Sequence, residues 1–167
     1  QGIYTQVSGN VLQSEAEFYT TVRAKCVPPK GANFLHTLQE EGVEYVEVRL
    51  LDVNPYLPLG IDEPQMHFLD VFLLYCLLTE SPEHHGALCD NVGLNVKAVV
   101  DNGQITSTML QDIAAARSLK DWGTEILEGV MVVAKWLDQT NGGGDYASSV
   151  NAQFAKLTDT SNVPSIA

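Results

Sequence analysis

The chain contains 167 residues, has a mass of 18.2 kDa and carries a formal net charge of −12. That length corresponds to about one domain, or to part of a larger one. A surface this acidic repels phosphate backbones and anionic lipid, so we expect neither nucleic acid nor a membrane surface as a partner. Apolar residues make up 45% of the sequence, which is enough for a packed core.

Neither export nor membrane insertion is predicted by the sequence. The longest uncharged apolar run, residues 71–78, is far shorter than the roughly 20 residues that span a bilayer. The first residues lack the basic segment and cleavage site of a secretory signal. Cys26, Cys76 and Cys89 are odd in number and lack metal-ligand spacing. We therefore expect a cytoplasmic protein with free, buried thiols.

The first fifty residues predict strands. Residues 10–19 and residues 43–51 alternate between apolar and polar side chains, with the β-branched and aromatic enrichment that is typical of strands. A third, shorter strand is expected over residues 3–7. The two longer strands are separated by a proline-containing connection of about twenty residues, with a short helix expected over residues 34–41.

After Pro55 the apolar spacing becomes helical. A helix capped by Asp62 is expected to run to about Thr79, and its second half is apolar nearly all round, which predicts a buried helix. Further helices are expected over 85–100, 107–116 and 118–139, followed by a last helix with an apolar stripe of Tyr146, Val150, Phe154 and Leu157. We expect residues 1–55 to form part of a sheet and residues 56–167 to be its helical support.

The polar faces of the predicted strands carry the candidate functional residues. On strand 43–51 this face presents Tyr45, Glu47 and Arg49. On strand 10–19 it presents Glu15, Glu17 and Tyr19, with Arg23 a little beyond. Carboxylates that hold Mg²⁺ and arginines that grip phosphate together suit phosphoryl transfer. The alternative is an ordinary salt-bridged, solvent-facing side of an antiparallel sheet.

Two of these segments resemble a known family. Residues 42–55 read GVEYVEVRLLDVNP, and residues 10–23 read NVLQSEAEFYTTVR. Both resemble strands of the proteobacterial-type glutamate–cysteine ligases (γ-glutamylcysteine synthetases). Residues 58–63 (PLGIDE) and 137–143 (LDQTNGG) continue the similarity, which is densest between positions 10 and 80.

The resemblance implies a fold and an activity. The fold is α+β, with part of a curved, mainly antiparallel sheet of the glutamine-synthetase type backed by helices. The activity joins the γ-carboxyl group of L-glutamate to the amine of L-cysteine through γ-glutamyl phosphate, with ATP as co-substrate, which is the first step of glutathione synthesis.

The resemblance also implies residue roles. Glu47 would be a ligand of Mg²⁺ or Mn²⁺, and Arg49 would be the catalytic residue that neutralises the transferred γ-phosphoryl group. Arg23 would be a second cationic contact near the nucleotide, and Tyr19 would line the cysteine pocket.

Two or three strands with a buried face do not form a sheet that is stable alone. We therefore expect this chain to be a segment of a longer polypeptide, with the missing remainder as its partner. The resemblance implies that it is a C-terminal-half segment of the ligase. We also expect the 167 residues to show no ligase activity by themselves. The alternative is a non-catalytic module, either a degenerate relative or a mostly helical interaction domain, since its apolar helices would expose hydrophobic surface without a partner.

Overall fold

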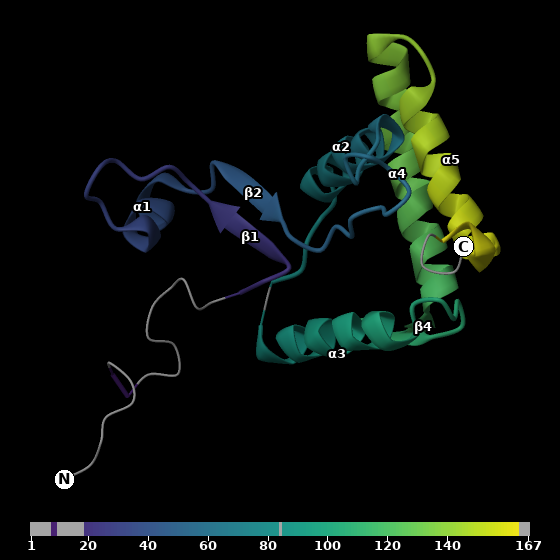
Figure 1. Cartoon of the computed structure of the whole chain (residues 1–167). Helices are drawn as coiled ribbons and strands as arrows, with labels where there is room; N and C mark the ends of the chain where they lie inside the picture. The colour runs from purple at the N-terminus through teal and green to yellow at the C-terminus, as the bar shows by residue number, and fades with distance from the viewer. Residues whose placement is uncertain (1–7, 10–18, 84, 164–167) are drawn as a thin grey trace. The chain divides into compact units, whose positions relative to one another are not determined.

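The structure, a computed structural model, describes residues 8–9, 19–83 and 85–163 (Figure 1). The chain divides into two compact units, residues 1–53 and 54–167, which are described separately below. The strand predicted over residues 3–7 lies outside the described residues, as do positions 10–18 of the next predicted strand, with Glu15 and Glu17.

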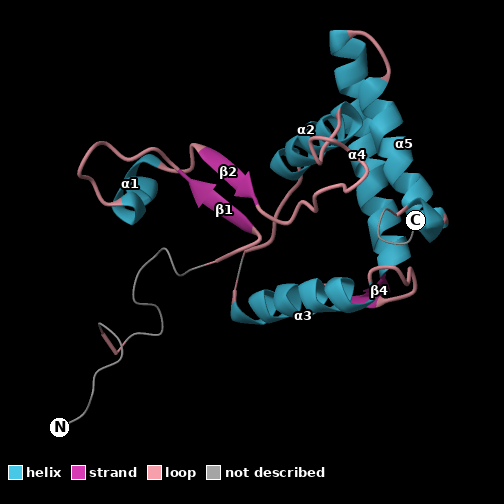
Figure 2. Cartoon of the chain, viewed as in Figure 1, coloured by secondary structure: helices cyan, strands magenta, loops and turns pink. Residues whose placement is uncertain are grey.

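The first unit contains an antiparallel pair of strands, β1 (Val22–Lys25) and β2 (Tyr45–Val48), joined through helix α1 (Phe34–Glu41) (Figure 2). Helix α1 is confirmed at the predicted residues. Strand β2 is confirmed, but it is shorter than the predicted 43–51. Strand β1 was missed, because it lies in the segment interpreted as a connection.

The end of α1 fixes where β2 can begin. Gly42 has a φ of +85°, a backbone conformation that costs little only for glycine, and its N–H donates to the Leu38 carbonyl (3.1 Å). Two residues later, the Glu44 N–H donates to the Lys25 carbonyl (2.8 Å), and the strand pairing continues from there. At the other end the Arg49 N–H donates to the Thr21 carbonyl (2.8 Å), so the ladder extends beyond both strands.

The second unit is mainly helical. Its elements are α2 (Glu63–Leu78), α3 (Gly86–Asn102), β3 (Met109–Gln111), β4 (Ala116–Ser118), α4 (Leu119–Asn141), α5 (Asp145–Thr158) and a 3₁₀ turn at Thr160–Asn162. Asp62 and Ser118 cap α2 and α4 as predicted, by accepting hydrogen bonds from the N–H groups of Gln65 and Asp121.

The prediction of a helix over residues 107–116 was wrong. This segment forms most of an antiparallel hairpin, in which β3 pairs with β4. The Asn95 side chain of α3 holds the outer edge of β3, since its amide accepts from the Gln111 N–H (2.7 Å) and donates to the Gln111 carbonyl (2.8 Å). A tertiary contact of this kind decides the structure of a short segment whose own periodicity is ambiguous.

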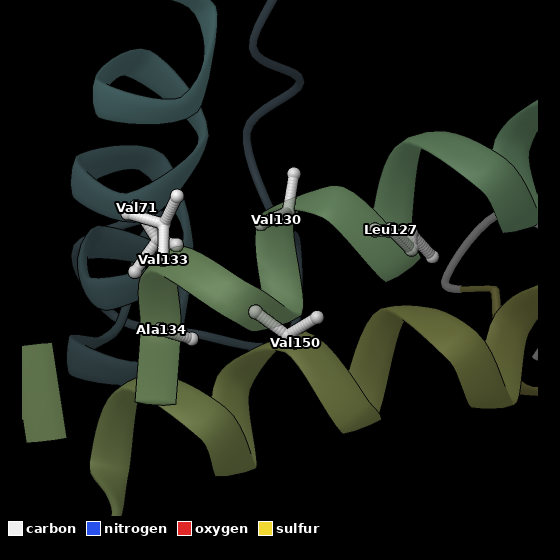
Figure 3. Close-up of a cluster of buried hydrophobic side chains, with 6 residues drawn as sticks. All are labelled: Val71, Leu127, Val130, Val133, Ala134 and Val150. Atoms are coloured by element: carbon white, nitrogen blue, oxygen red, sulfur yellow. The ribbon is translucent and has the colours of Figure 1, made fainter. Parts of the chain in front are cut away.

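The core of the second unit lies where α2 meets α4 and α5. Val71, Val130 and Val150, one from each helix, are fully buried, and Figure 3 shows them with Leu127, Val133 and Ala134. The apolar stripe predicted for the last helix is confirmed, because Tyr146, Phe154 and Leu157 pack against this cluster around Val150.

Helix α2 has the predicted bounds, but it is not buried all round. Val71 is its buried residue, whereas Met66, Leu73 and Leu77 are exposed. These three residues follow helical spacing along the face opposite Val71. The helices of this chain therefore cover one side of α2 and leave an apolar stripe on the other.

The cysteine prediction was correct in part. All three cysteines are free thiols, but Cys26 alone is buried, whereas Cys76 and Cys89 are exposed. The two exposed cysteines lie on α2 and α3, whose outer faces are not covered within the described part of the chain.

The α+β class is confirmed, with two separate two-stranded antiparallel sheets among the described residues. None of the described helices combines the length and the apolar composition that crossing a bilayer requires.

The core predicts a sharp difference between two valines on α4. Val130 is fully buried, and Val130→Ala removes its packed methyl groups. We therefore expect the free energy of unfolding to fall by about 2 kcal/mol. The matched control is Val132→Ala, because Val132 lies two positions further along α4 and is 69% exposed. This variant should change the free energy of unfolding by no more than about 0.5 kcal/mol. Chemical denaturation of both variants measures the difference, and equal losses would contradict the assigned core.

Candidate functional site

One face of the β1–β2 ladder gathers charged side chains. Arg23 and Glu47 are directly opposite each other in the antiparallel register. Because side chains alternate along a strand, a single face receives Thr21, Arg23, Lys25, Tyr45, Glu47 and Arg49. Among these six described residues there are three basic groups and one carboxylate, so the face carries a formal charge of +2 in a chain of net charge −12.

Glu47 is at the centre of this cluster. Its Oε2 accepts a hydrogen bond from Arg49 Nη2 (2.6 Å), and its Oε1 lies 3.7 Å from Lys25 Nζ. The Arg49 contact is a short, charge-assisted hydrogen bond, whereas the Lys25 contact is a looser ion pair. The two oxygens of one carboxylate therefore face two different cations.

An aromatic ring restrains the other side of Arg49. The Arg49 guanidinium carbon lies 5.0 Å from the centre of the Tyr19 ring, in cation–π range. Tyr19 itself is 78% exposed. The structure thus brings together Tyr19, Glu47 and Arg49 as the sequence predicted, and places Arg23 across the ladder from Glu47.

Two residues of this cluster were missed from the sequence. Lys25 lies two positions after Arg23, so alternation would have placed it on the same face if β1 had been identified as a strand. Phe34 contacts both Arg23 and Lys25 from the start of α1, and no local pattern in the sequence predicted that contact.

The cations around Glu47 favour its charged form. The hydrogen bond from Arg49 is the main cause that lowers the pKa of the Glu47 carboxyl, and the charges of Lys25, Arg49 and Arg23 add to it against a desolvation cost. Glu47 is therefore held ionised, as a metal ligand or an ion-pair partner must be.

A second ion-pair cluster, in the helical unit, has the opposite charge balance. Arg117 of β4 lies 3.5 Å from Asp112, pairs closely with Glu125 of α4 and lies over the Trp122 ring (5.7 Å). One cation between two carboxylates leaves this cluster negative, so it would repel phosphate. We interpret it as a structural link that fastens the β3–β4 hairpin to α4.

The described residues do not form a metal site by themselves, since no group of three or more of them with His, Cys, Asp or Glu side chains is close enough to hold an ion. Mg²⁺ is commonly held by one or two protein carboxylates together with substrate phosphates and water. Glu47 has the chemistry of a single protein ligand in such an arrangement, and the neighbouring Lys25 and Arg49 have the charge that phosphate binding requires.

Comparison with known proteins decides the family. The family model for glutamate–cysteine ligase matches residues 1–99, more than half of the chain, including the whole β1–β2 ladder. The chain belongs to the glutamate–cysteine ligase family. The resemblance predicted from residues 10–23 and 42–55 is thereby confirmed.

Individual glutamate–cysteine ligases extend the similarity over nearly the whole chain. The enzyme of Pseudomonas fluorescens (strain Pf0-1) is 42% identical over 164 residues, which cover 98% of this chain and 31% of that protein. The enzyme of Pseudomonas putida (strain KT2440) is 40% identical over 164 residues, which again cover 98% of this chain and 31% of that protein. The chain thus spans about a third of the length of these relatives.

A solved structure supports the fold. The glutamate–cysteine ligase of Francisella tularensis, determined in complex with AMP, matches with a TM-score of 0.84 and 32% identity. The match covers 96% of this chain and 32% of that one. The arrangement of helices and small antiparallel sheets described above is therefore similar to part of a glutamate–cysteine ligase.

The lowered pKa of Glu47 makes a pH-dependent prediction. A carboxyl group whose pKa is lower in the folded state contributes stability above its ordinary pKa, near 4.3, and loses that contribution as the pH falls through the lowered value. In Arg49→Gln we expect the pKa of Glu47 to rise toward the ordinary value, because the shorter, neutral glutamine cannot supply the charge-assisted hydrogen bond or the positive charge of Arg49. Carbon-13 NMR titration of the Glu47 carboxyl measures this pKa. Lys30→Gln is the control and should leave the pKa of Glu47 unchanged. An unaltered titration in Arg49→Gln would contradict the pairing.

Proposed function

We propose that this chain supplies about a third of an ATP-dependent glutamate–cysteine ligase, including part of its nucleotide-phosphate site. The observation that carries the proposal is the Arg49–Glu47 pair, which lies at the end of β2 on a positively charged face in a chain of this family. A face with excess positive charge attracts the triphosphate of ATP, and an anchored carboxylate beside it suits the accompanying metal ion. L-glutamate, L-cysteine and ATP are the proposed substrates.

Arg49 is the proposed catalytic residue and nucleotide contact. A guanidinium presents five N–H donors in a fixed fork, so one arginine can pair with a carboxylate and a phosphate at the same time. Tyr19 and Glu47 restrain Arg49 on two sides, which reduces the entropy lost when a phosphate binds. Arg23, across the ladder, is the proposed second nucleotide contact. The AMP bound to the Francisella tularensis ligase is consistent with a nucleotide site in such enzymes.

Tyr19 is the proposed contact to the cysteine substrate. Its ring touches the Arg49 guanidinium while most of its surface is exposed, so it can border both a phosphate site and a neighbouring pocket. An aromatic ring with a polar tip suits a small substrate that has both apolar and polar parts.

Glu47 is the proposed ligand of Mg²⁺, or of Mn²⁺ in its place. The donor chemistry fits, because these hard ions prefer carboxylate oxygens and share their coordination with nucleotide phosphates. When bound, the ion would neutralise charge on the phosphates of ATP. Oε1 is the better placed of the two oxygens, since its 3.7 Å contact with Lys25 is looser than the Arg49 contact with Oε2.

The proposed reaction has two steps. A γ-carboxylate oxygen of glutamate attacks the γ-phosphorus of ATP, and the bond to the bridging oxygen breaks to give γ-glutamyl phosphate and ADP. The cysteine amine then attacks the carbonyl carbon, inorganic phosphate leaves, and the nitrogen loses a proton. Arg49 would hold the transferred phosphoryl group in the first step and stabilise the departing phosphate in the second.

The rest of the polypeptide is the proposed partner of the exposed stripe on α2, formed by Met66, Leu73 and Leu77. Three large apolar side chains in a row are costly to leave in water, and the relatives have about two thirds of their length outside the matched segment. We propose that those residues cover the stripe and add further strands beside β1 and β2. A curved, mainly antiparallel sheet of the glutamine-synthetase type would result.

The functional proposal is tested in the full-length ligase that contains this chain. We expect Glu47→Gln and Arg49→Lys each to lower kcat by roughly a hundredfold or more, because each removes charge or geometry needed at the transferring phosphate. Glu47→Gln should also raise the Mg²⁺ concentration needed for half-maximal turnover. Glu41→Gln, an exposed glutamate at the end of α1, is the matched control and should keep normal turnover.

Two outcomes would contradict this proposal. Near-normal turnover in both variants would remove Glu47 and Arg49 from the site. Absence of ATP- and cysteine-dependent turnover in the folded, unsubstituted full-length protein would instead favour a degenerate, non-catalytic relative.

The stripe on α2 makes a separate prediction. Leu73→Ser combined with Leu77→Ser should destabilise the full-length ligase by about 3 kcal/mol, since two large side chains would leave a covered interface. In the 167-residue chain alone the same pair should have a smaller effect, because Leu77 is 79% exposed and Leu73 is 38% exposed. Denaturation curves compare the two, and an unaffected full-length protein would show that the stripe is not covered by the rest of the polypeptide.

A further inference from the structure

The Phe34 ring of α1 lies against two cations of β1. Its centre is 5.0 Å from Lys25 Nζ and 5.5 Å from the Arg23 guanidinium carbon. Both distances are within cation–π range, and both cations belong to the face that carries Glu47 and Arg49. A single ring from the connecting helix therefore contacts two of the three basic groups on this face.

The position of the ring is fixed by its local structure. Phe34 is the first residue of α1, and the Asn33 side chain caps the helix by accepting from the His36 N–H (3.0 Å). The next turn is held by Thr37, whose buried hydroxyl donates to the Asn33 carbonyl (3.0 Å). The half-buried ring thus projects from an ordered helix start.

An aromatic ring restrains a cation without cancelling its charge. A carboxylate placed where Phe34 lies would also hold Lys25, but it would lower the formal charge of the face from +2 to +1. The quadrupole of the ring attracts the ammonium group and leaves the net charge unchanged. Lys25 is otherwise held only loosely by Glu47 on this face, at 3.7 Å, so the ring is its second restraint.

We propose that Phe34 is a positioning residue of this face, which holds Lys25 and Arg23 as a pair of phosphate-binding cations beside Arg49. This inference rests on the proposed function and adds Lys25 as a third cation of the phosphate site. Phe34 acts through the two cations and does not touch the nucleotide. Its removal therefore weakens the binding of the phosphates and leaves the binding of the nucleoside unchanged.

The test compares Phe34→Leu with Phe34→Tyr in the full-length ligase. Binding of AMP-PNP, an ATP analogue that does not transfer its phosphate, is measured by calorimetry with Mg²⁺ and compared with binding of adenosine. In Phe34→Leu we expect AMP-PNP to bind about five- to tenfold more weakly and adenosine to bind normally, since two cation–π contacts are lost. Phe34→Tyr keeps the ring and should restore AMP-PNP binding.

Matched variants separate this role from a general loss of structure. Leu35→Ala alters the exposed neighbour of Phe34 on the same helix, and both ligands should bind as in the unsubstituted protein. Lys25→Met removes one of the two cations and changes no residue of α1, so it should weaken AMP-PNP binding even if Phe34→Leu fails to fold. A kinetic readout adds to this: Phe34→Leu should raise the KM for ATP with little change in kcat.

The outcomes distinguish this inference from the proposed function. Normal AMP-PNP binding in both Phe34→Leu and Lys25→Met, together with weaker binding in Arg49→Lys, would overturn the role of Phe34 and keep the proposed phosphate site. Normal binding in all three variants would overturn the phosphate site itself. Equal weakening of adenosine and AMP-PNP in Phe34→Leu would show that the ring supports the fold and does not position the cations.

Discussion

The sharing of one carboxylate between two cations is the interaction on which the site depends. Glu47 of β2 pairs with Arg49, which directly follows β2, and with Lys25 of β1, so the ion pairs join three side chains and link the two strands. This geometry requires an antiparallel ladder in which Glu47 stands opposite Arg23. A shift of one residue would turn the Glu47 side chain to the other face and disperse the cluster.

Charge balance separates this cluster from an ordinary salt-bridged surface. The other ion-pair network in the described part of the chain surrounds Arg117 with two carboxylates and is negative. Among its described residues, the β1–β2 face has three basic side chains for one carboxylate, and aromatic rings hold these cations without cancelling their charge. In a chain of net charge −12, a local surplus of this kind favours a bound anion over simple structural support.

The sequence predicted the parts of the fold that depend on local signals. Alternation in residues 43–51 predicted which side of β2 carries Glu47 and Arg49, and the caps Asp62 and Ser118 predicted two helix starts. It failed where a tertiary contact decides the structure. The four residues of β1 become a strand by pairing with β2, and residues 109–111 pair with β4 and with the Asn95 side chain of α3. Phe34 was missed for the same reason, because its contacts to β1 join residues about ten positions apart.

In the proposed function, Glu47 and Arg49 face a nucleotide in the full-length ligase. A crystal structure of that ligase with AMP-PNP and Mg²⁺ tests this placement. We expect the terminal phosphate within hydrogen-bonding distance of the Arg49 guanidinium, with the ion coordinated by a Glu47 oxygen. A nucleotide bound elsewhere, with the Glu47–Arg49 pair turned to open solvent, would contradict it.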